Sequence, residues 1–275
     1  MCKKIVTVAA VVLAVCGLAL ADNVIDIDQI GTPASATVSQ EGSNQSIIID
    51  QIGVSADPST GLVNNVWAKQ WKYGPYKIDV YQNAGTYNYA WLYQSLGGQQ
   101  EIKAVQNAGT GYNYLMANQA NWKGNNIDIK QTAGTTNWAE LTDGYYMTDI
   151  VIKQEAATYN KAYVYQNINN SSMYLYGADS SGNIDNTKPA TQISTDGSND
   201  LKVEQYNNDS IGLYQSGFGN NWAEIYQKNG NNTLGIYQTN TDGYNSVIAT
   251  QNGNSSATVI QSTTSGAGTI TVDQG

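Results

Sequence analysis

The sequence predicts an all-β fold, a two-sheet β-solenoid of about ten turns. Three observations support this prediction. From Gln29 to Gln274 a glutamine returns every 10 to 13 residues, with few lapses. An asparagine or another polar residue usually stands six residues before each glutamine, and apolar residues alternate with other types between the two. A repeat this short cannot bury an apolar face by itself, so each copy must stack on its neighbours.

Residues 1–21 are predicted to be a secretory signal peptide that precedes the repeat domain, residues 22–275. Two lysines come before a mostly apolar run, and residues 19–21 read Ala-Leu-Ala, a small-x-small cleavage pattern. A transmembrane anchor and a lipoprotein processed at Cys16 are the alternatives. Cleavage before Asp22 would remove both cysteines, so the exported chain would form neither a disulfide nor a thiolate metal site.

The composition narrows the possible partners. The chain has 13 Lys+Arg against 22 Asp+Glu, a net charge of −9, and no arginine or histidine. An acidic chain without arginine repels phosphate and lacks the best reader of base edges, so no nucleic-acid partner is expected. Twenty tyrosines and six tryptophans accompany one phenylalanine, which suits half-exposed positions on a sheet. A disordered low-complexity chain is the alternative, and the regular period argues against it.

The repeat can be numbered from position 0, usually asparagine, to position 6, usually glutamine. In 21 aligned segments, position 2 is apolar in 20 and position 4 in all. This period of two predicts a β-strand with one buried face, and positions 0 and 6 share the parity of that face. A buried amide needs a hydrogen-bond partner, which the same residue one turn away can supply. The predicted glutamine ladder comprises Gln29, Gln40, Gln51, Gln70, Gln82, Gln94, Gln106, Gln119, Gln131, Gln154, Gln166, Gln205, Gln215, Gln227, Gln238, Gln251, Gln261 and Gln274.

The links between segments hold four or five residues, often with a glycine, which is too few for a crossover helix and suits a tight arc. Two places break the rhythm. The spacing from Gln51 to Gln70 is 19 and that from Gly177 to Gln192 is 15, and we interpret both as looped-out insertions in one domain. A boundary between two solenoid blocks near 178–190 is the alternative. Pro189 lies in the fourteenth segment and removes a strand donor, so the predicted ladder does not include Gln192.

The outward positions 1, 3 and 5 predict two different faces. Lysines and acids alternate on the odd segments five to nine, as in Lys77 and Glu101. Aromatic residues on the even segments could bind a partner, a carbohydrate or another fibre, or could reflect only their preference for exposed strands. The predicted aromatic face comprises Trp67, Tyr89, Trp91, Tyr93, Tyr114, Trp138, Tyr163 and Tyr165.

The array resembles the curlin repeat of bacterial curli subunits. The pattern Asn/Ser-x5-Gln followed by x-Gly-x-x-Asn-x5-Gln fits Gln40-Glu-Gly42, with Gln51 following and Gln45 in place of asparagine. The resemblance covers essentially all of 23–275. It implies a secreted subunit that polymerises into extracellular amyloid fibres of the biofilm matrix. It also implies an outer-membrane secretion channel and a nucleating subunit as partners.

The sequence indicates no catalytic site, cofactor or metal. Without His, Arg or Cys after residue 21, His-based triads and thiolate or imidazole metal sites are not expected. A solenoid polysaccharide lyase or hydrolase is the enzyme alternative, and it would need clustered acids. A non-polymerising surface adhesin or a minor nucleating subunit is the second functional hypothesis. Strands predicted at both ends without polar caps favour the fibre subunit, which would join copies of itself head to tail.

Overall fold

The fold is described from a computed structural model of the 275-residue chain. The described residues are 3–8, 12–18, 23–30, 34–41, 44–52, 63–71, 75–95, 98–120, 125–132, 134–143, 148–156, 159–166, 173–178, 184–185, 190–194, 198–206 and 210–275. Every element in this part of the chain is a β-strand, so the predicted all-β solenoid class is confirmed. No helix in these residues is long and apolar enough to cross a membrane.

The strands follow one another with short connections. They are β1 (Lys3–Val8), β2 (Val12–Leu18), β3 (Asn23–Ile30), β4 (Ala34–Glu41), β5 (Gln45–Ile52), β6 (Val63–Trp71), β7 (Tyr76–Ser95), β8 (Gln100–Ala120), β9 (Asn125–Thr132), β10 (Thr136–Asp143), β11 (Thr148–Ala156), β12 (Tyr159–Gln166), β13 (Met173–Ala178), β14 (Ile184–Asp185), β15 (Ala190–Ser194), β16 (Ser198–Tyr206), β17 (Ser210–Gly217), β18 (Asn221–Asn240), β19 (Asn245–Thr263) and β20 (Gly268–Gln274).

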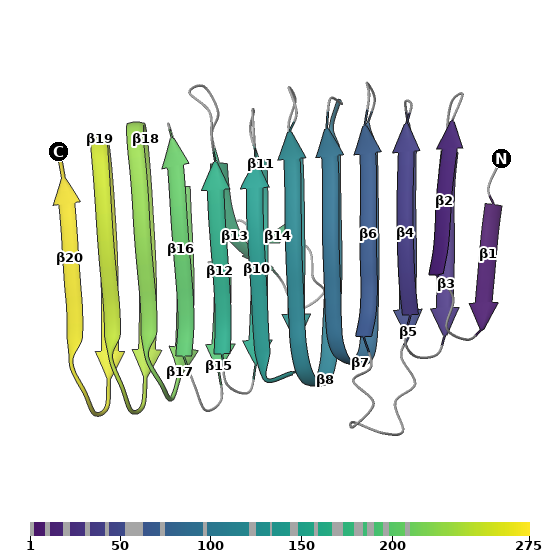
Figure 1. The fold of residues 1–275 in the computed structure, drawn as a ribbon. Coiled ribbons are helices and arrows are strands. Elements are labelled where there is room, and N and C mark those ends of the chain that lie inside the picture. Colours follow the sequence, from purple (N-terminus) through teal and green to yellow (C-terminus); the bar gives the residue numbers. More distant parts are fainter. Residues whose placement is uncertain are drawn as a thin grey trace.

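The strands stack in two columns of parallel, in-register neighbours, drawn as two layers with opposite arrow directions in Figure 1. The first column contains β1, β3, β5, the first halves of β7 and β8, β9, β11, β13 with β15, β17, and the second halves of β18 and β19. The second column contains β2, β4, β6, the second halves of β7 and β8, β10, β12, β16, the first halves of β18 and β19, and β20.

Two details of the prediction differ slightly from the structure. The columns are joined into one 20-stranded sheet rather than two separate sheets, because β7, β8, β18 and β19 keep strand geometry through the arc that links the columns. The turn count also departs from the predicted ten. β1 and β2, inside the predicted signal peptide, pair with β3 and β4 as a further turn. Whether residues 1–21 are cleaved remains a prediction.

The core lies between the columns and follows the predicted alternation. On β4 and β5 buried residues alternate with half-buried ones, and positions 2 and 4 supply the apolar row. Ile47, Ile78, Ile102 and Ile127 are fully buried at position 2 of successive turns of the first column. Burial of each such side chain stabilises the fold by about 1.5–3 kcal/mol. The stack therefore has one continuous apolar core.

The thirteenth and fourteenth segments share one strand position of the first column, whereas the prediction counted them as two successive strands. β13 pairs with the first half of β11, and β15 pairs with its second half. Between them β14 pairs antiparallel with β13, so the chain leaves the turn midway and then returns to it. β17 pairs with both β13 and β15, which continues the column past this insertion. The other predicted insertion, between Gln51 and Gln70, lies mostly outside the described residues.

The arcs bring backbone very close to backbone. Gly134 has a φ of +81°, a conformation that residues with a side chain rarely adopt. A Cβ atom at this position would lie 2.7 Å from the carbonyl oxygen of Gly111 in the arc of the neighbouring turn. Thr135 donates its backbone N–H to that same oxygen at 2.7 Å. Glycine is therefore required here both by conformation and by space.

Candidate functional site

The glutamines at position 6 of the first column form a continuous row of side-chain hydrogen bonds. In each bond the Nε2 of one glutamine donates to the Oε1 of the glutamine in the preceding turn. The donor–acceptor distances are 2.7–2.9 Å, typical of good amide hydrogen bonds. The row contains Gln29, Gln51, Gln82, Gln106, Gln131, Gln154, Gln192, Gln215, Gln238 and Gln261.

Each of these amides also bonds across the core. The Nε2 of Gln82 donates to the carbonyl oxygen of Tyr89 on the opposite column at 3.0 Å, and Gln131 donates to that of Trp138 at 2.9 Å. The same bond recurs seven or eight residues ahead in most turns, for example from Gln215 to Trp222. Both N–H groups of the buried amide thus find acceptors, which removes the cost of burying it. Position 6 therefore ties neighbouring turns together and ties the two columns to each other.

The second column carries a similar row, described in two pieces. Gln40, Gln70, Gln94 and Gln119 are joined by three bonds of 2.9–3.0 Å. Gln227, Gln251 and Gln274 are joined by two bonds of 2.8 and 3.0 Å. Position 6 is Asp143 in the turn after Gln119. The side chains of Gln166 and Gln205 lie outside the described residues, so their part in the ladder remains a prediction.

Leaving Gln192 out of the ladder was wrong. Its Nε2 donates to Gln154 at 2.8 Å, and it accepts from Gln215 at 2.7 Å. The exclusion rested on Pro189, which cannot donate to a strand. β15 begins only at Ala190, however, and it places Gln192 in register with Gln154. The proline therefore precedes the part of the segment that stacks.

A row of asparagines at position 0 of the second column was missing from the predicted ladder. The Nδ2 of Asn64 donates to the Oδ1 of Asn88, and six further bonds of 2.8–3.1 Å continue the row through Asn113, Asn137, Asn160, Asn199, Asn221 and Asn245. All eight are buried. The signal was present in the sequence, because asparagine occupies position 0 in 12 of the 21 segments.

At position 0 of the first column, one turn has a tyrosine where its neighbours have glutamine. Tyr76 stands between Gln45 and Gln100 in register. The amide atoms of both glutamines are buried and have no hydrogen-bond partner among the described residues. Burial, followed by the charge of Glu41, raises the pKa of the Tyr76 phenol far above its usual range. A mismatch of one residue thus interrupts an amide ladder on both sides.

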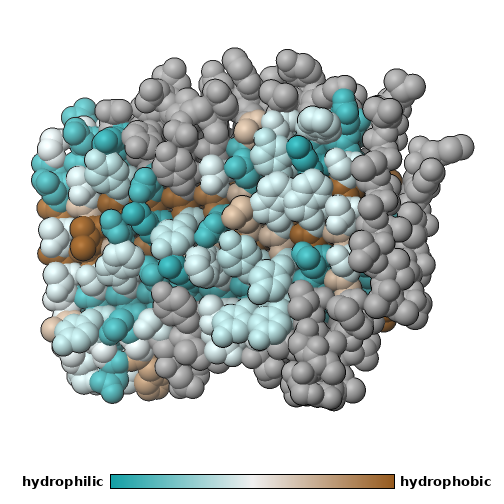
Figure 2. All heavy atoms as spheres, viewed as in Figure 1, coloured by the Kyte–Doolittle hydropathy of each residue, from teal (hydrophilic) through white to brown (hydrophobic). Residues whose placement is uncertain are grey.

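The predicted aromatic face lies on the outer surface of the second column, where ring-bearing side chains gather over the middle of the stack (Figure 2). Trp67 and Trp91 stack with ring centroids 5.1 Å apart and an interplanar angle of 10°. Tyr114 contacts both Tyr89 and Trp138, and Trp138 contacts Tyr163. The ring centroids of Tyr93 and Trp91 are 6.1 Å apart. Trp67, Trp91 and Tyr93 therefore cover one another's ring faces. The Nζ of Lys161 lies over the rings of Trp138 and Tyr163. The side chain of Tyr165 is outside the described residues.

The outer surface of the first column is charged. The Nζ of Lys77 lies 3.1 Å from Asp79 and 3.8 Å from Glu101, and all three side chains are partly exposed. Such pairs contribute little stability individually. Burial raises the pKa of Asp128 to about 6, and Lys103 opposes this shift. Asp79, Lys103 and Asp128 alternate in sign across three turns. Elsewhere in the column like charges do face each other, as in the register pairs Asp28 with Asp50 and Lys130 with Lys153.

The last turn is exposed although its sequence follows the same pattern. Val247 at position 2 of β19 is fully buried, whereas Ile270, its register partner on β20, is 49% exposed. Ala257, Val259 and Val272, at positions 2 and 4 of the same turn, are only partly buried, and brown, hydrophobic residues reach the surface at this end of the stack in Figure 2. The amide of Gln274 belongs to the ladder but is exposed. An apolar row that is core elsewhere is therefore a surface here.

The backbone of β20 also offers unused groups. Gly275 donates its N–H to Gln251 and accepts from Gly253, so its peptide groups face β19. Successive residues of an extended strand alternate the edge to which their N–H and C=O groups point. Ile270, Val272 and Gln274 therefore direct these groups away from β19, and no described strand pairs with that side. Such an edge is a template for another strand.

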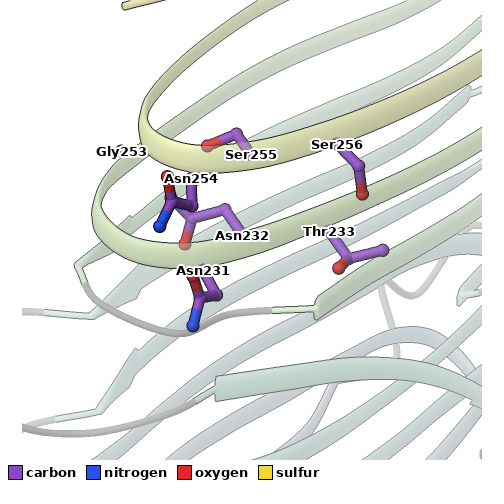
Figure 3. Close-up of a pocket in the computed structure, with 7 residues that line it drawn as sticks. All are labelled: Asn231, Asn232, Thr233, Gly253, Asn254, Ser255 and Ser256. Carbon is purple, nitrogen blue, oxygen red and sulfur yellow. The ribbon is translucent and has the colours of Figure 1, made fainter.

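The arcs of β18 and β19 at the same end form an open polar groove. It is lined by Asn231, Asn232, Thr233, Gly253, Asn254, Ser255 and Ser256, which Figure 3 shows along two neighbouring arcs. Amides and hydroxyls line it, and it contains no titratable side chain. Within the described residues, no group of three or more Asp, Glu, His or Cys could hold a metal ion.

The comparisons with known proteins agree with the repeat analysis. A family model described as curlin associated repeat matches residues 21–53, which include β3, β4 and β5. No curated protein and no solved structure matches the chain. A curlin repeat in a parallel β-solenoid favours a structural rather than an enzymatic protein. The matched segment, residues 21–53, confirms the predicted resemblance to the curlin repeat.

Proposed function

We propose that the protein is a secreted structural subunit that polymerises head to tail into extracellular amyloid fibres of a biofilm matrix. The observation that carries this proposal is the open turn formed by β20 and the second half of β19. Its apolar row is exposed, its backbone groups face outward, and its glutamines sit at the end of both ladders. A second copy in the same register would bury all three sets of groups at once.

The opposite end of the stack supports the same arrangement. The Nε2 of Gln40 is buried and has no hydrogen-bond partner among the described residues. Its register neighbour on β2 is Gly17, which has no side chain to accept a hydrogen bond. Removal of residues 1–21 would replace this neighbour. The Oε1 of Gln274 in a second copy is the acceptor that the rest of the ladder would provide.

The column order fits a continuous fibre. The last turn consists of the second half of β19 in the first column and β20 in the second column. After cleavage, the first turn of the next copy would consist of β3 in the first column and β4 in the second. β3 would then stack on β19 and β4 on β20, with Gln29 on Gln261 and Gln40 on Gln274. Neither column would have to change direction at the junction.

The resemblance to curli subunits also implies partners and a role in adhesion, and both are part of this proposal. A secretion channel in the outer membrane and a nucleating subunit would deliver the chain and start the fibre. The aromatic face would contribute to surface adhesion through ring edges and hydroxyls, because its stacked tryptophans do not present their faces to a sugar. A non-polymerising adhesin or a minor nucleating subunit is the alternative, and it would keep the last turn covered by a different partner.

The test is assembly of purified residues 22–275. The proposal predicts fibres that bind amyloid dyes and diffract at about 4.7 Å along the fibre axis. A matched sample that retains residues 1–21, solubilised in mild detergent, should elongate more slowly because β1 and β2 cover β3 and β4. Chains that stay monomeric over days at high concentration would contradict the fibre function and favour the adhesin.

A further inference from the structure

Two pairs of tyrosines stand out from the other tyrosine–tyrosine contacts because their rings are nearly parallel. Tyr87 and Tyr112 have centroids 5.4 Å apart and an interplanar angle of 3°. Tyr214 and Tyr237 have centroids 5.6 Å apart and an angle of 7°. The members of each pair are register partners on neighbouring turns, so the backbone holds them side by side.

Both pairs are accessible to solvent. Tyr112 is 45% exposed and Tyr237 is 41% exposed, and the other member of each pair is half-buried. None of the four belongs to the predicted aromatic face, and the two pairs lie on opposite columns. A third pair, Tyr89 and Tyr114, is 5.9 Å apart but tilted by 43°. The chain therefore contains its own control for ring orientation.

We infer that Tyr87–Tyr112 and Tyr214–Tyr237 are sites of dityrosine cross-linking between neighbouring turns. A one-electron oxidant, such as a peroxidase supplied with hydrogen peroxide, removes an electron and a proton from each phenol. The two phenoxyl radicals combine through the ring carbons ortho to oxygen, and a C–C bond forms. The hydrogen on each of these carbons then passes to the phenolic oxygens. The balance is two tyrosines and one hydrogen peroxide giving one dityrosine and two waters.

The geometry favours this reaction because the register places one partner nearest and most parallel: Tyr112 lies 5.4 Å from Tyr87 at 3°, whereas Tyr89 lies 6.4 Å from it at 26°. In-register parallel strands keep neighbouring backbones about 4.8 Å apart, so ortho carbons approach each other by small rotations of the side chains. The parallel orientation of the rings also lets the two radical-bearing π-systems overlap, which the tilted pair does less well. The cross-link would join β7 to β8 and β17 to β18, and would restrict the unfolded chain as other covalent links do.

The experiment treats dilute monomeric protein with peroxidase and hydrogen peroxide and maps the products after trypsin cleavage. The expected product runs as a monomer, gains dityrosine fluorescence and loses two hydrogens per cross-link. Cleavage after lysine separates Tyr87, in 78–103, from Tyr112, in 104–123, so the linked peptide and its fragmentation locate the bond. The cross-linked protein should also unfold at a higher denaturant concentration.

Phenylalanine variants keep the stacked rings and remove only the phenolic hydroxyl groups. Tyr87→Phe with Tyr112→Phe should abolish one linked peptide and leave the Tyr214–Tyr237 peptide unchanged. Tyr89→Phe with Tyr114→Phe is the matched control and should leave both linked peptides. Oxidation in concentrated guanidinium should scramble the pattern. Cross-links spread evenly over the tyrosines, or dominated by Tyr89–Tyr114, would overturn the inference. The result does not depend on fibre formation, because the bond forms within one chain.

Discussion

The interior turns and the last turn have the same residue pattern, but the interior turns bury it and the last turn exposes it. Ile150 at position 2 of β11 is 1% exposed, whereas Ile270 at position 2 of β20 is 49% exposed. The amide of Gln154 is buried between two ladder partners, whereas that of Gln274 bonds to one described glutamine and is exposed. The difference comes from position in the stack and not from residue type. A repeat of this chain therefore has a closed core only where another repeat covers it.

The largest expected effect comes from blocking the open edge. Proline at both Ile270 and Val272 would remove two N–H groups that face away from β19 and would disturb the exposed apolar row. We expect elongation from wild-type seeds to be lost, as measured by dye fluorescence against time. Thr269→Ser with Thr271→Ser retains every backbone donor and should elongate normally. Wild-type growth of the proline variant would mean that fibres do not grow through β20.

Truncation of an interior isoleucine should cost much more than truncation of an edge isoleucine. Ile150→Ala should destabilise the monomer by about 2–5 kcal/mol, because it leaves a cavity in a closed core. Ile270→Ala should change the denaturation midpoint of freshly purified monomer only slightly. In fibres the two variants should converge, because the junction would bury Ile270. Denaturant resistance measured on monomer and on fibre would separate these cases.

Removing one rung of the glutamine ladder should have an intermediate effect. Gln94→Leu would leave Gln70, Gln119 and the carbonyl of Glu101 without their present partner, at a cost of about 1–3 kcal/mol. Tyr93→Ser, at the adjacent outward position, should cost much less. The measurement is the denaturant midpoint of each variant. Equal losses for the two variants would argue that the amide bonds contribute little to stability.

The smallest effect concerns the pH dependence of stability. Burial raises the pKa of Asp128 to about 6, with Glu101 and Asp79 adding to the shift and Lys103 and Lys130 opposing it. The folded protein then holds this proton more tightly than the unfolded chain, in which an aspartate has a pKa of about 4. The contribution of Asp128 to stability therefore falls as the pH rises from about 4 to about 6.

Asp128→Asn should consequently be more stable than wild type at pH 7, and the advantage should shrink toward pH 4. The measurement is the denaturation midpoint of both proteins across this range. Asp273→Asn, at an exposed position of β20, serves as the control and should show a smaller difference. A constant difference between Asp128→Asn and wild type at every pH would show that the carboxyl does not titrate in this window.

The period of the sequence was sufficient to predict the fold class and the inward direction of glutamine. Alternation at positions 2 and 4 determines which face is buried, and position 6 follows from parity. Register between distant segments, such as β13 and β15 sharing one turn, could not be predicted, because it depends on where an insertion leaves and rejoins the stack. For the same reason Gln192 was misjudged, since the effect of Pro189 depends on where β15 begins. The asparagine ladder follows from the same parity, because asparagine at position 0 lies on the buried face of the strand.

Packing between side chains was the other feature that the sequence did not reveal. Tyr87 and Tyr112 lie in arcs, outside positions 0 to 6, so the repeat numbering gave no reason to pair them. Their contact depends on an irregularity in β7 and β8, where the register shifts between Asn83 and Tyr87. The side-chain amides of Gln45 and Gln100 likewise lack hydrogen-bond partners because their shared register neighbour is Tyr76, and no local motif predicts this.

The most direct test of head-to-tail growth is a disulfide across the proposed junction. In fibres of residues 22–275, Thr271 on β20 and Thr37 on β4 of the next copy would be register partners on the outer surface. Their Cα atoms would lie about 4.8 Å apart, within the range that a disulfide spans. Thr271→Cys with Thr37→Cys should therefore give covalent ladders of oligomers after mild oxidation of fibres, and monomers after oxidation before assembly. Asp273→Cys with Thr37→Cys places the pair about 8 Å apart and should give few oligomers. Fibres that cross-link equally with both pairs, or with neither, would contradict the account.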